Sequence, residues 1–357
     1  MTSMKGVQLT APGQYRLRRD LPVPEPGPNE IRLRVAAAGI CGTDVHICHG
    51  DPSMNGMIAP PVVLGHEFCG HIDKLGAAVD AAKFELGAFA SAEMHEVCHE
   101  CAACRDGAYH ACATARIRGV NMDGAFAEFV VVSASNVVLL PADLPVQVAA
   151  VLDPLGNAVH TAMKVPVAGR TCAIVGFGPI GAMCGEVAAF VGSTQIYVLD
   201  VSDHALQRAR DWVERRSLHD RVTIVDARKN PVEAVVAGTG GGVDVALEIS
   251  GHPDGINNAI QMVRPAGHVV NLGLPRGDAV TIERFSKNFI FKGLTMHAVV
   301  GREMFRTWHQ MLDLLKNGLD IRHFITAEMP LESFAEGVER FGRGEEQKVV
   351  LYPGERA

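Results

Sequence analysis

The spacing of hydrophobic and polar positions changes near residue 155. Before that point, short apolar segments such as residues 31–37 and 127–132 are separated by glycine and proline turns, of which residues 22–28 form one. Segments of this length and spacing are typical of strands. We therefore expect the first 155 residues or so to be rich in β-structure.

After residue 155 the pattern alternates between short buried-type strands and helices. The segment 171–175 predicts a strand, which a glycine turn joins to a helical pattern that continues to Phe190. The alternation then continues with strands at 195–199, 222–225, 243–249 and 269–272 and a helix at 205–212. Alternating units of this length predict a parallel, doubly wound sheet that is covered on both faces.

From about residue 299 the chain leaves this alternation, and residues 304–316 predict an amphipathic helix with Trp308 and Met311 on its buried face. The expected layout is a nucleotide-binding domain inserted in a catalytic domain that both ends of the chain build. We assign residues 1–155 to the first part of the catalytic domain, 156–298 to the nucleotide-binding domain, and 299–357 to the return. The expected fold class is α/β.

Composition narrows the possible partners. The formal net charge of −7 leaves no basic excess to neutralise phosphates, so we expect neither nucleic acid nor an anionic membrane as partner. Residues 1–15 lack the apolar core of a signal peptide. The long apolar stretch 171–192 is a candidate membrane span, but its glycines and proline favour a strand, a turn and a buried helix.

Four of the nine cysteines lie close together, at Cys98, Cys101, Cys104 and Cys112. Without an export signal, this crowding indicates metal ligation rather than disulfides, which places the protein in a reducing compartment, the cytoplasm. Four such thiolates predict a closed structural zinc site. An iron–sulfur cluster is the alternative, but in its motif the third cysteine is followed by x3-Cys-Pro. Here seven residues separate Cys104 from Cys112, and no proline follows Cys112. We expect the isolated Cys48, Cys69, Cys172 and Cys184 to be small buried side chains.

A glycine motif follows the first predicted strand of the alternating region. Gly176, Gly178 and Gly181 form G-x-G-x-x-G directly before a helix, where backbone N–H groups can bind a pyrophosphate. Asp200 ends the next strand, 19 residues after Gly181, where a carboxylate can bind ribose hydroxyls. Residues 201–206 contain no Arg or Lys to neutralise a 2′-phosphate. The motif therefore predicts NAD rather than NADP.

A second set of candidate ligands consists of Cys41, His66 and Glu67. Catalytic zinc needs about three protein ligands and an open position, where a substrate alcohol can bind and lose its proton. One Cys and one His 25 residues apart are equally compatible with core packing. These residue types alone leave the two interpretations open.

The surrounding residues resemble the zinc-dependent medium-chain dehydrogenase/reductase superfamily, the alcohol dehydrogenases. The resemblance rests on Gly65-His66-Glu67-x2-Gly70-x5-Gly76-x2-Val79, on Gly39-Ile-Cys41-Gly-Thr43-Asp44-Val-His46, on the four-cysteine lobe and on the NAD motif. It covers nearly the whole chain. It implies a Rossmann domain beside a GroES-like catalytic domain, two zinc ions per chain, and a homo-oligomer, either dimer or tetramer.

Two further segments resemble the L-threonine 3-dehydrogenase subfamily. They are Leu-Asp-Pro-Leu-Gly-Asn-Ala-Val-His-Thr at 152–161 and Gly-Arg-Glu-Met-Phe-Arg-Thr-Trp at 301–308. The resemblance implies NAD-dependent oxidation of a secondary alcohol, L-threonine to 2-amino-3-oxobutanoate, with His95 beside the substrate. Arg302 could pair with a substrate carboxylate or equally with an acid such as Glu303.

The resemblance also implies a role for each site residue. Cys41 and His66 would bind the catalytic zinc, with Glu67 a ligand or close neighbour. Thr43 and His46 would pass the alcohol proton through the nicotinamide ribose towards water, and Asp153 would act near the metal. The residues that would contact NAD are Ile180, Asp200, Leu272 and Leu274.

In the subfamily, an aromatic, acidic loop with tryptophans follows the relay histidine. This chain departs from that pattern, because its residues 47–58 contain no Trp, Tyr or Phe. Ala205 and Val300 replace an expected Arg and Tyr near the cofactor, and Gly-Ala-Phe-Ala at 87–90 replaces the usual Gly-Asp-Arg-Val turn. The altered loop keeps open the same chemistry on a polyol, diol or sugar. A non-catalytic NAD-binding sensor is the alternative from another class.

Overall fold

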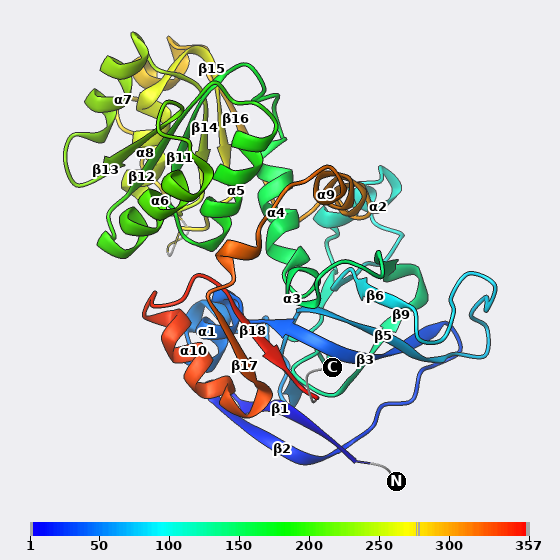
Figure 1. The fold of residues 1–357 in the computed structure, drawn as a ribbon. Coiled ribbons are helices and arrows are strands. Elements are labelled where there is room, and N and C mark those ends of the chain that lie inside the picture. Colours follow the sequence, from blue (N-terminus) through cyan, green and yellow to red (C-terminus); the bar gives the residue numbers. More distant parts are fainter. Residues whose placement is uncertain (1–2, 276, 278, 355–357) are drawn as a thin grey trace. The chain divides into compact units, whose positions relative to one another are not determined.

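The computed structural model describes residues 3–275, 277 and 279–354, and the chain divides into two compact units (Figure 1). The first unit comprises Met1–Pro154, Glu303–Trp308 and Arg322–Ala357, and the second comprises Leu155–Arg302 and His309–Ile321. The second unit thus includes His309–Ile321, which the sequence pattern assigns to the catalytic domain.

The second unit is built on a parallel sheet with the strand order β13-β12-β11-β14-β15-β16. Counted from β11, this is the order 3-2-1-4-5-6 of dinucleotide-binding folds. Every described pair in the sheet is parallel, which requires a crossover connection between successive strands. The strands are β11 (Thr171–Val175), β12 (Gln195–Asp200), β13 (Val222–Asp226), β14 (Val243–Glu248), β15 (Val263–Asn271) and β16 (Thr295–Ala298).

Helices cover both faces of this sheet (Figure 1). Side chains of α7 and α8, among them Val235 and Ile260, share one apolar core with Ala173 of β11. Alternate strand residues such as Ile174 face α5, whose Gly185 lies against Ile174, Phe177 and Trp212. The helices of the unit are α5 (Pro179–Phe190), α6 (Asp203–Arg216), α7 (Pro231–Thr239) and α8 (Pro253–Met262), while α4 (Leu152–Ala162) and α9 (Arg306–Lys316) are divided between the units.

The first unit is dominated by antiparallel strands. Its largest sheet has the order β10-β6-β5-β3-β18-β17, with β9 also paired to β3. The described strands are β1 (Ser3–Ala11), β2 (Gln14–Pro22), β3 (Glu30–Gly39), β4 (Val62–Val63), β5 (Glu67–Leu75), β6 (Phe89–Ala92), β7 (His95–Glu96), β8 (Arg116–Ile117), β9 (Phe129–Ser133), β10 (Val137–Leu139), β17 (Ala327–Pro330) and β18 (Val349–Tyr352). Because β18 pairs with β3, both ends of the chain contribute to one sheet.

Short helices connect the strands of the first unit. They are α1 (Gly42–Cys48), α2 (Ala102–Arg105), α3 (Val146–Ala149) and α10 (Phe334–Gly342). Helix α1 packs against α10, from the C-terminal part of the chain (Figure 1). A buried apolar cluster that includes Leu33, Phe126 and Leu351 joins the strands of both chain ends. The first unit is therefore held together by hydrophobic burial across segments far apart in sequence.

The expected α/β class and parallel sheet are confirmed, with shifts at element ends that have local causes. Helix α6 begins at Asp203, because the Ser202 side chain caps it, and ends before Ser217 in a left-handed conformation. Helix α9 begins at Arg306 rather than Met304, since Phe305 has a φ of 65°. The predicted burial of Trp308, Met311 and the four isolated cysteines is confirmed. Within the described residues, no helix is long and apolar enough to cross a membrane.

Candidate active site

Cys41, His66 and Glu67 come together in the first unit. Strand β3 runs antiparallel to β5, with Gly39 opposite Glu67, and Cys41 follows directly at the start of α1. One ligand atom of each of the three residues lies within 4.8 Å of the others. The register of one strand pair therefore brings the two segments of the predicted catalytic zinc site together.

Asp44 is a buried carboxylate beside Cys41 and His66. Its side chain is completely buried, and Oδ2 accepts a 2.8 Å hydrogen bond from the backbone N–H of Cys41. Its other oxygen lies 3.6 Å from Nδ1 of His66. Burial raises the pKa of Asp44 to about 6, against the opposing effect of His66. For His66, burial lowers the pKa, but Asp44 and the Cys41 thiol outweigh it and raise the pKa to about 10.

These residues fit a zinc ion. Thiolate, imidazole and carboxylate are the ligands zinc takes in proteins. Nδ1 of His66 is buried and makes no hydrogen bond within the described residues. The acids around His66 also favour positive charge at this point, which is the electrostatic condition a cation needs. Asp153, only 6% exposed, is one of the charges that act on His66.

Glu67 forms a buried ion pair with Lys348. The Lys348 ammonium group lies 2.8 Å from Oε1 and 2.6 Å from Oε2 of Glu67, and also donates to the Ile40 carbonyl at 2.6 Å. Both side chains are at most 1% exposed. Burial opposes the charge on Lys348, but the Glu67 carboxylate and Cys41 raise its pKa above the ordinary value. Glu67 is thus ion-paired inside the unit as well as close to Cys41 and His66.

His95 is held by a buried carboxylate that the sequence pattern does not single out. Nδ1 of His95 lies 2.6 Å from Oε1 of Glu93, a residue with no exposed surface. The other oxygen of Glu93 accepts a 3.0 Å hydrogen bond from the indole N–H of Trp308. Asn136 further donates to the backbone carbonyls of both Glu93 and His95. The ring of His95 is therefore fixed at its Nδ1 side.

The two predicted relay residues lie on α1. Thr43 and His46 are three positions apart on one side of the helix, with Thr43 Oγ1 3.9 Å from the Cys41 sulfur. Nδ1 of His46 lies 2.8 Å from Oδ2 of Asp51, and both side chains are partly exposed. Helix α1 thus links the cluster residue Cys41 to an imidazole that solvent can reach.

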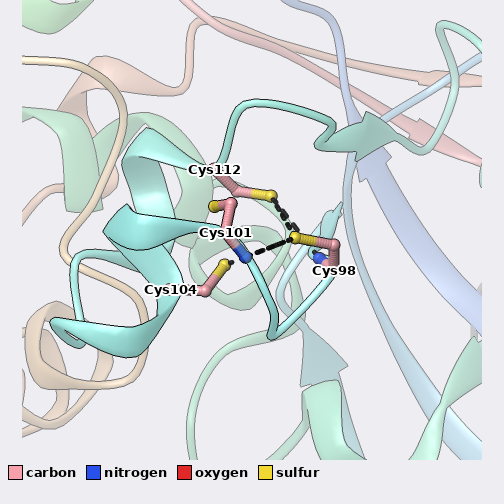
Figure 2. A group of neighbouring side chains, drawn as sticks. All are labelled: Cys98, Cys101, Cys104 and Cys112. Carbon is pink, nitrogen blue, oxygen red and sulfur yellow. Dashed lines mark hydrogen bonds between the residues drawn. The ribbon is translucent and has the colours of Figure 1, made fainter.

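The four cysteines of the predicted structural site converge, as Figure 2 shows. The Cys98 sulfur lies 3.9 Å from that of Cys104 and 3.6 Å from that of Cys112. Sulfurs bound at about 2.3 Å to one tetrahedral ion would lie about 3.8 Å apart. The pKa of Cys98 is lowered to about 6, chiefly by the backbone N–H groups of Glu100 and Cys101. The lobe therefore fits a closed four-thiolate zinc site.

The glycine motif of the second unit forms a tight turn between β11 and α5. Gly176 has a φ of 94°, and a Cβ on Gly181 would collide with the Gly176 carbonyl. A Cβ on Gly178, by contrast, would point into open space. Gly178 is the N-cap of α5, so free backbone N–H groups of the first turn lie beside that space. The turn fits a bound pyrophosphate.

The other residues predicted to contact the cofactor lie at the carboxyl edge of the same sheet. Asp200 ends β12 and accepts hydrogen bonds from the backbone N–H groups of Phe177, at 2.7 Å, and Ser202, at 2.8 Å. Leu272 follows β15, and its N–H bonds to the Glu248 carbonyl. Leu274 is 89% exposed, whereas Ile180 in the first turn of α5 is half-buried. Ligands bind at this edge in doubly wound sheets.

Parts of the two segments with the subfamily resemblance, residues 155–161 and 301–302, lie in the second unit, where they meet. Nδ1 of His160 lies 2.9 Å from the carbonyl oxygen of Gly301. The Arg302 side chain is 1% exposed, and its stem lies against Gly156. Glu303 pairs with Arg306 at 3.0 Å.

Comparison with known proteins agrees with this architecture. Residues 27–142 match the alcohol dehydrogenase GroES-like domain, and residues 179–317 match the zinc-binding dehydrogenase domain. Relatives more than 30% identical extend over nearly the whole chain. The chain belongs to the zinc-binding alcohol dehydrogenase family.

Within this family, the chain is similar to the L-threonine 3-dehydrogenase of Symbiobacterium thermophilum, with 36% identity over 99% of both chains. It is 40% identical to that of Bacillus velezensis over 94% of both. A putative zinc-binding dehydrogenase from Sinorhizobium meliloti 1021, bound to NADP, superposes with a TM-score of 0.87 at 30% identity, covering 99% of this chain and 100% of the other. The 2R,3R-butanediol dehydrogenase of Bacillus subtilis superposes with a TM-score of 0.86 at 25% identity. That match covers 98% of this chain and 100% of the other.

Proposed function

We propose that the protein oxidises the 3-hydroxyl of L-threonine to 2-amino-3-oxobutanoate with NAD as hydride acceptor. The observation that carries the substrate is the near full-length similarity to L-threonine 3-dehydrogenases. The convergence of Cys41, His66 and Glu67 supports the chemistry. His95, whose ring is bonded to Glu93, supplies a positioned imidazole for a polar substrate, and Trp308 holds Glu93 in turn.

The proposed mechanism divides the work among the residues of this chain. Cys41 and His66, with Glu67 as ligand or close neighbour, would hold a zinc ion. A zinc ion bound there would polarise the substrate hydroxyl, and bound NAD would accept the hydride. Thr43 would accept the hydroxyl proton while its own hydroxyl hydrogen passes through the nicotinamide ribose to His46, which would release a proton to solvent. Asp153 acts on His66 from nearby and stabilises its orientation.

The proposed cofactor is NAD rather than NADP. Each Asp200 oxygen already accepts one backbone hydrogen bond and can accept a ribose hydroxyl as well. A 2′-phosphate there would face Asp200 and its register partner Asp226. Arg228 lies nearby, but its guanidinium bonds to Asp203 and Asp226. The charge around Asp200 therefore supports the unphosphorylated cofactor.

Two further parts of the proposal concern the whole protein. We place a second, structural zinc in the four-cysteine lobe, whose thiolates suit the reducing cytoplasm. We also propose a homo-oligomer, since large apolar side chains of the second unit are exposed, among them Phe291 at 82% and Ile290 at 54%. Size-exclusion chromatography with light scattering would measure the mass, and a monomer of 38.1 kDa would contradict the oligomer.

A second candidate is oxidation of a neutral diol, polyol or sugar by the same residues. The altered loop at 47–58 favours it, as does the similarity to a butanediol dehydrogenase. A non-catalytic NAD-binding sensor is a weaker candidate, because Cys41, His66 and Glu67 are assembled.

The test is NAD reduction by the purified, zinc-loaded protein on L-threonine, 2,3-butanediol, and a panel of polyols and sugars, with NADP in parallel. We expect the highest kcat/KM with L-threonine and NAD. Faster turnover of a neutral diol would assign the substrate to the second candidate. No turnover of any alcohol would contradict the catalytic proposal and favour the sensor.

A further inference from the structure

The loop that distinguishes this chain carries a carboxylate directed at the relay histidine. Asp51 lies five residues after His46, and its Oδ2 is 2.8 Å from Nδ1 of that ring. Its Oδ1 accepts a 2.9 Å hydrogen bond from the backbone N–H of Ser53, at the start of the short helix Pro52–Met54. Each oxygen of Asp51 thus has its own partner.

The protonation of this pair follows from the chemistry of the carboxylate. The pKa of Asp51 is lowered to about 2, by the backbone N–H and side chain of Ser53 and then by His46. An ionised carboxylate can only accept hydrogen bonds, so Nδ1 of His46 must carry the hydrogen that it donates. In the neutral ring, the lone pair is then on Nε2. His46 therefore keeps one nitrogen ready to accept a proton.

We propose that Asp51 is a positioning residue for proton transfer, which fixes His46 in the Nδ1–H tautomer and stabilises the imidazolium formed when Nε2 accepts the substrate proton. This inference rests on the proposed function, since His46 must receive the proton of an alcohol. A carboxylate with this relation to a general-base histidine sets both its tautomer and its orientation. The partly exposed position of the pair leaves solvent free to remove the proton afterwards.

No other charged group described around α1 bonds to His46. The second histidine of that helix region, His49, lies 3.1 Å from Glu339 of α10. Glu336 of α10 pairs with Arg340, and Asp44 is buried under the metal cluster. The His49–Glu339 pair is therefore a matched control, because it also joins a partly exposed histidine to a partly exposed carboxylate but contains no predicted site residue.

The substitution Asp51→Asn separates the two roles of Asp51. Its amide oxygen can still accept from the Ser53 N–H, which leaves the NH2 group facing His46. An NH2 group donates, so Nδ1 would have to accept and the hydrogen would move to Nε2. The ring would then present a donor where the substrate proton must arrive. Asp51→Ser is a second variant, whose hydroxyl can accept from Ser53 but is too short to reach His46.

The experiment compares the wild type, D51N, D51S, H46Q, D51N/H46Q and the control E339Q. The measurements are kcat and KM for NAD reduction on L-threonine from about pH 6 to about pH 10, a range that brackets the titration of an ordinary histidine. We expect D51N to lower kcat at neutral pH by about a hundredfold, the lower range for loss of a general base. The deficit should shrink as pH rises and hydroxide takes the proton directly. KM for NAD and the melting temperature should stay near those of E339Q.

Two results would overturn the proposal. The first is a D51N enzyme with the pH profile of E339Q. The second is a D51N/H46Q enzyme slower than H46Q by the full factor of D51N, because residues that act through one another should not lose activity independently. If D51N fails to fold, D51S is read by the same criteria.

A measurement without turnover separates this inference from the proposed function. In protein labelled with 15N-histidine, the His46 signal, assigned by its loss in H46Q, reports which ring nitrogen carries hydrogen. We expect Nδ1–H in the wild type and Nε2–H in D51N, even if no alcohol is oxidised. Nε2–H in the wild type would refute the role of Asp51 directly, whereas an inactive wild type with Nδ1–H would refute only the proposed function.

Discussion

The position of the His95 ring depends on Glu93, whose carboxylate bonds both to that ring and to the indole of Trp308. Glu93 is fully buried, so these groups rather than water are the hydrogen-bond partners of its side-chain oxygens. His95 could be singled out from the sequence by resemblance, but Glu93 could not. Glu93 lies between β6 and β7, where no periodic pattern predicts a hydrogen bond to His95, and Trp308 is 215 positions away in the sequence.

Replacing Glu93 by Gln should therefore loosen His95. The amide can satisfy only one of the two donors, and hydrogen bonds to a charged group contribute about 1.5–3 kcal/mol, so we expect KM for L-threonine to rise roughly tenfold or more. KM for NAD should hardly change. Trp308→Phe, which removes one of the two bonds, should have a smaller effect in the same direction. Equal changes in both Michaelis constants would show that Glu93 serves general stability only.

Lys348 and Glu67 form the second pair that the sequence could not reveal. The two residues are 281 positions apart, and a lysine near the C-terminus ordinarily suggests an exposed charge. The pairing of β18 with β3 brings them together inside the first unit. The sequence motif could place Glu67 near Cys41 and His66, but it could not reveal the ammonium group of Lys348 that pairs with Glu67.

Lys348→Met should destabilise the protein strongly, because it leaves the Glu67 carboxylate buried without its partner. Loss of one member of a buried ion pair typically costs about 3–5 kcal/mol in the free energy of unfolding. Denaturant unfolding measures this change, with Lys316→Met, at an exposed position, as control. A loss no larger than that of Lys316→Met would show that the pair contributes little to folding.

At the scale of elements, the strands and helices of the second unit follow closely from sequence because their signals are local. Strand β11 matches the predicted bounds, and α5 ends at Phe190 as expected. The antiparallel first unit is harder to predict. Its strand order depends on pairings such as β18 with β3, between the two ends of the chain. Alternating polarity cannot specify which distant strands become neighbours.

In the glycine turn before α5, one substitution should weaken NAD binding without affecting folding, and another should affect folding. A Cβ on Gly178 would occupy open space, so Gly178→Ala should fold with a melting temperature close to the wild type. It should still weaken NAD binding by roughly tenfold or more, since the methyl group occupies the approach of the pyrophosphate. Titration calorimetry would measure this Kd. Gly181→Ala should instead lower stability, because its Cβ meets the Gly176 carbonyl. Unchanged NAD affinity in Gly178→Ala would contradict the proposed pyrophosphate site.

At the scale of the whole molecule, sequence motifs identify both the candidate metal ligands of the first unit and the glycine turn of the second. Such motifs can be read from sequence because the residues that bind one ligand lie at short, fixed spacings, as in the lobe from Cys98 to Cys112. The division into units was less accessible. His309–Ile321 belongs with the second unit, although the sequence from residue 299 onwards reads as a return to the first. An amphipathic helix shows that one face is buried, but not which core it joins.

The two zinc sites should respond differently to substitution. Metal analysis should give two zinc ions per chain in the wild type and one in both Cys41→Ser and Cys104→Ser. Cys41→Ser should lose activity with little loss of stability, because catalytic zinc is needed mainly for chemistry. Cys104→Ser should lower the melting temperature, since a closed structural site contributes to folding. A wild type with one zinc ion would contradict the two-site assignment.

The most direct test of the central claim follows the hydride itself. Purified, zinc-loaded protein would be mixed with NAD and L-threonine that carries deuterium at C3, and the cofactor analysed by mass spectrometry and NMR. We predict that deuterium appears at C4 of the nicotinamide ring in step with the formation of 2-amino-3-oxobutanoate, and that Cys41→Ser abolishes the transfer. Reduced cofactor without deuterium, or no reduction of NAD by L-threonine at all, would contradict the account.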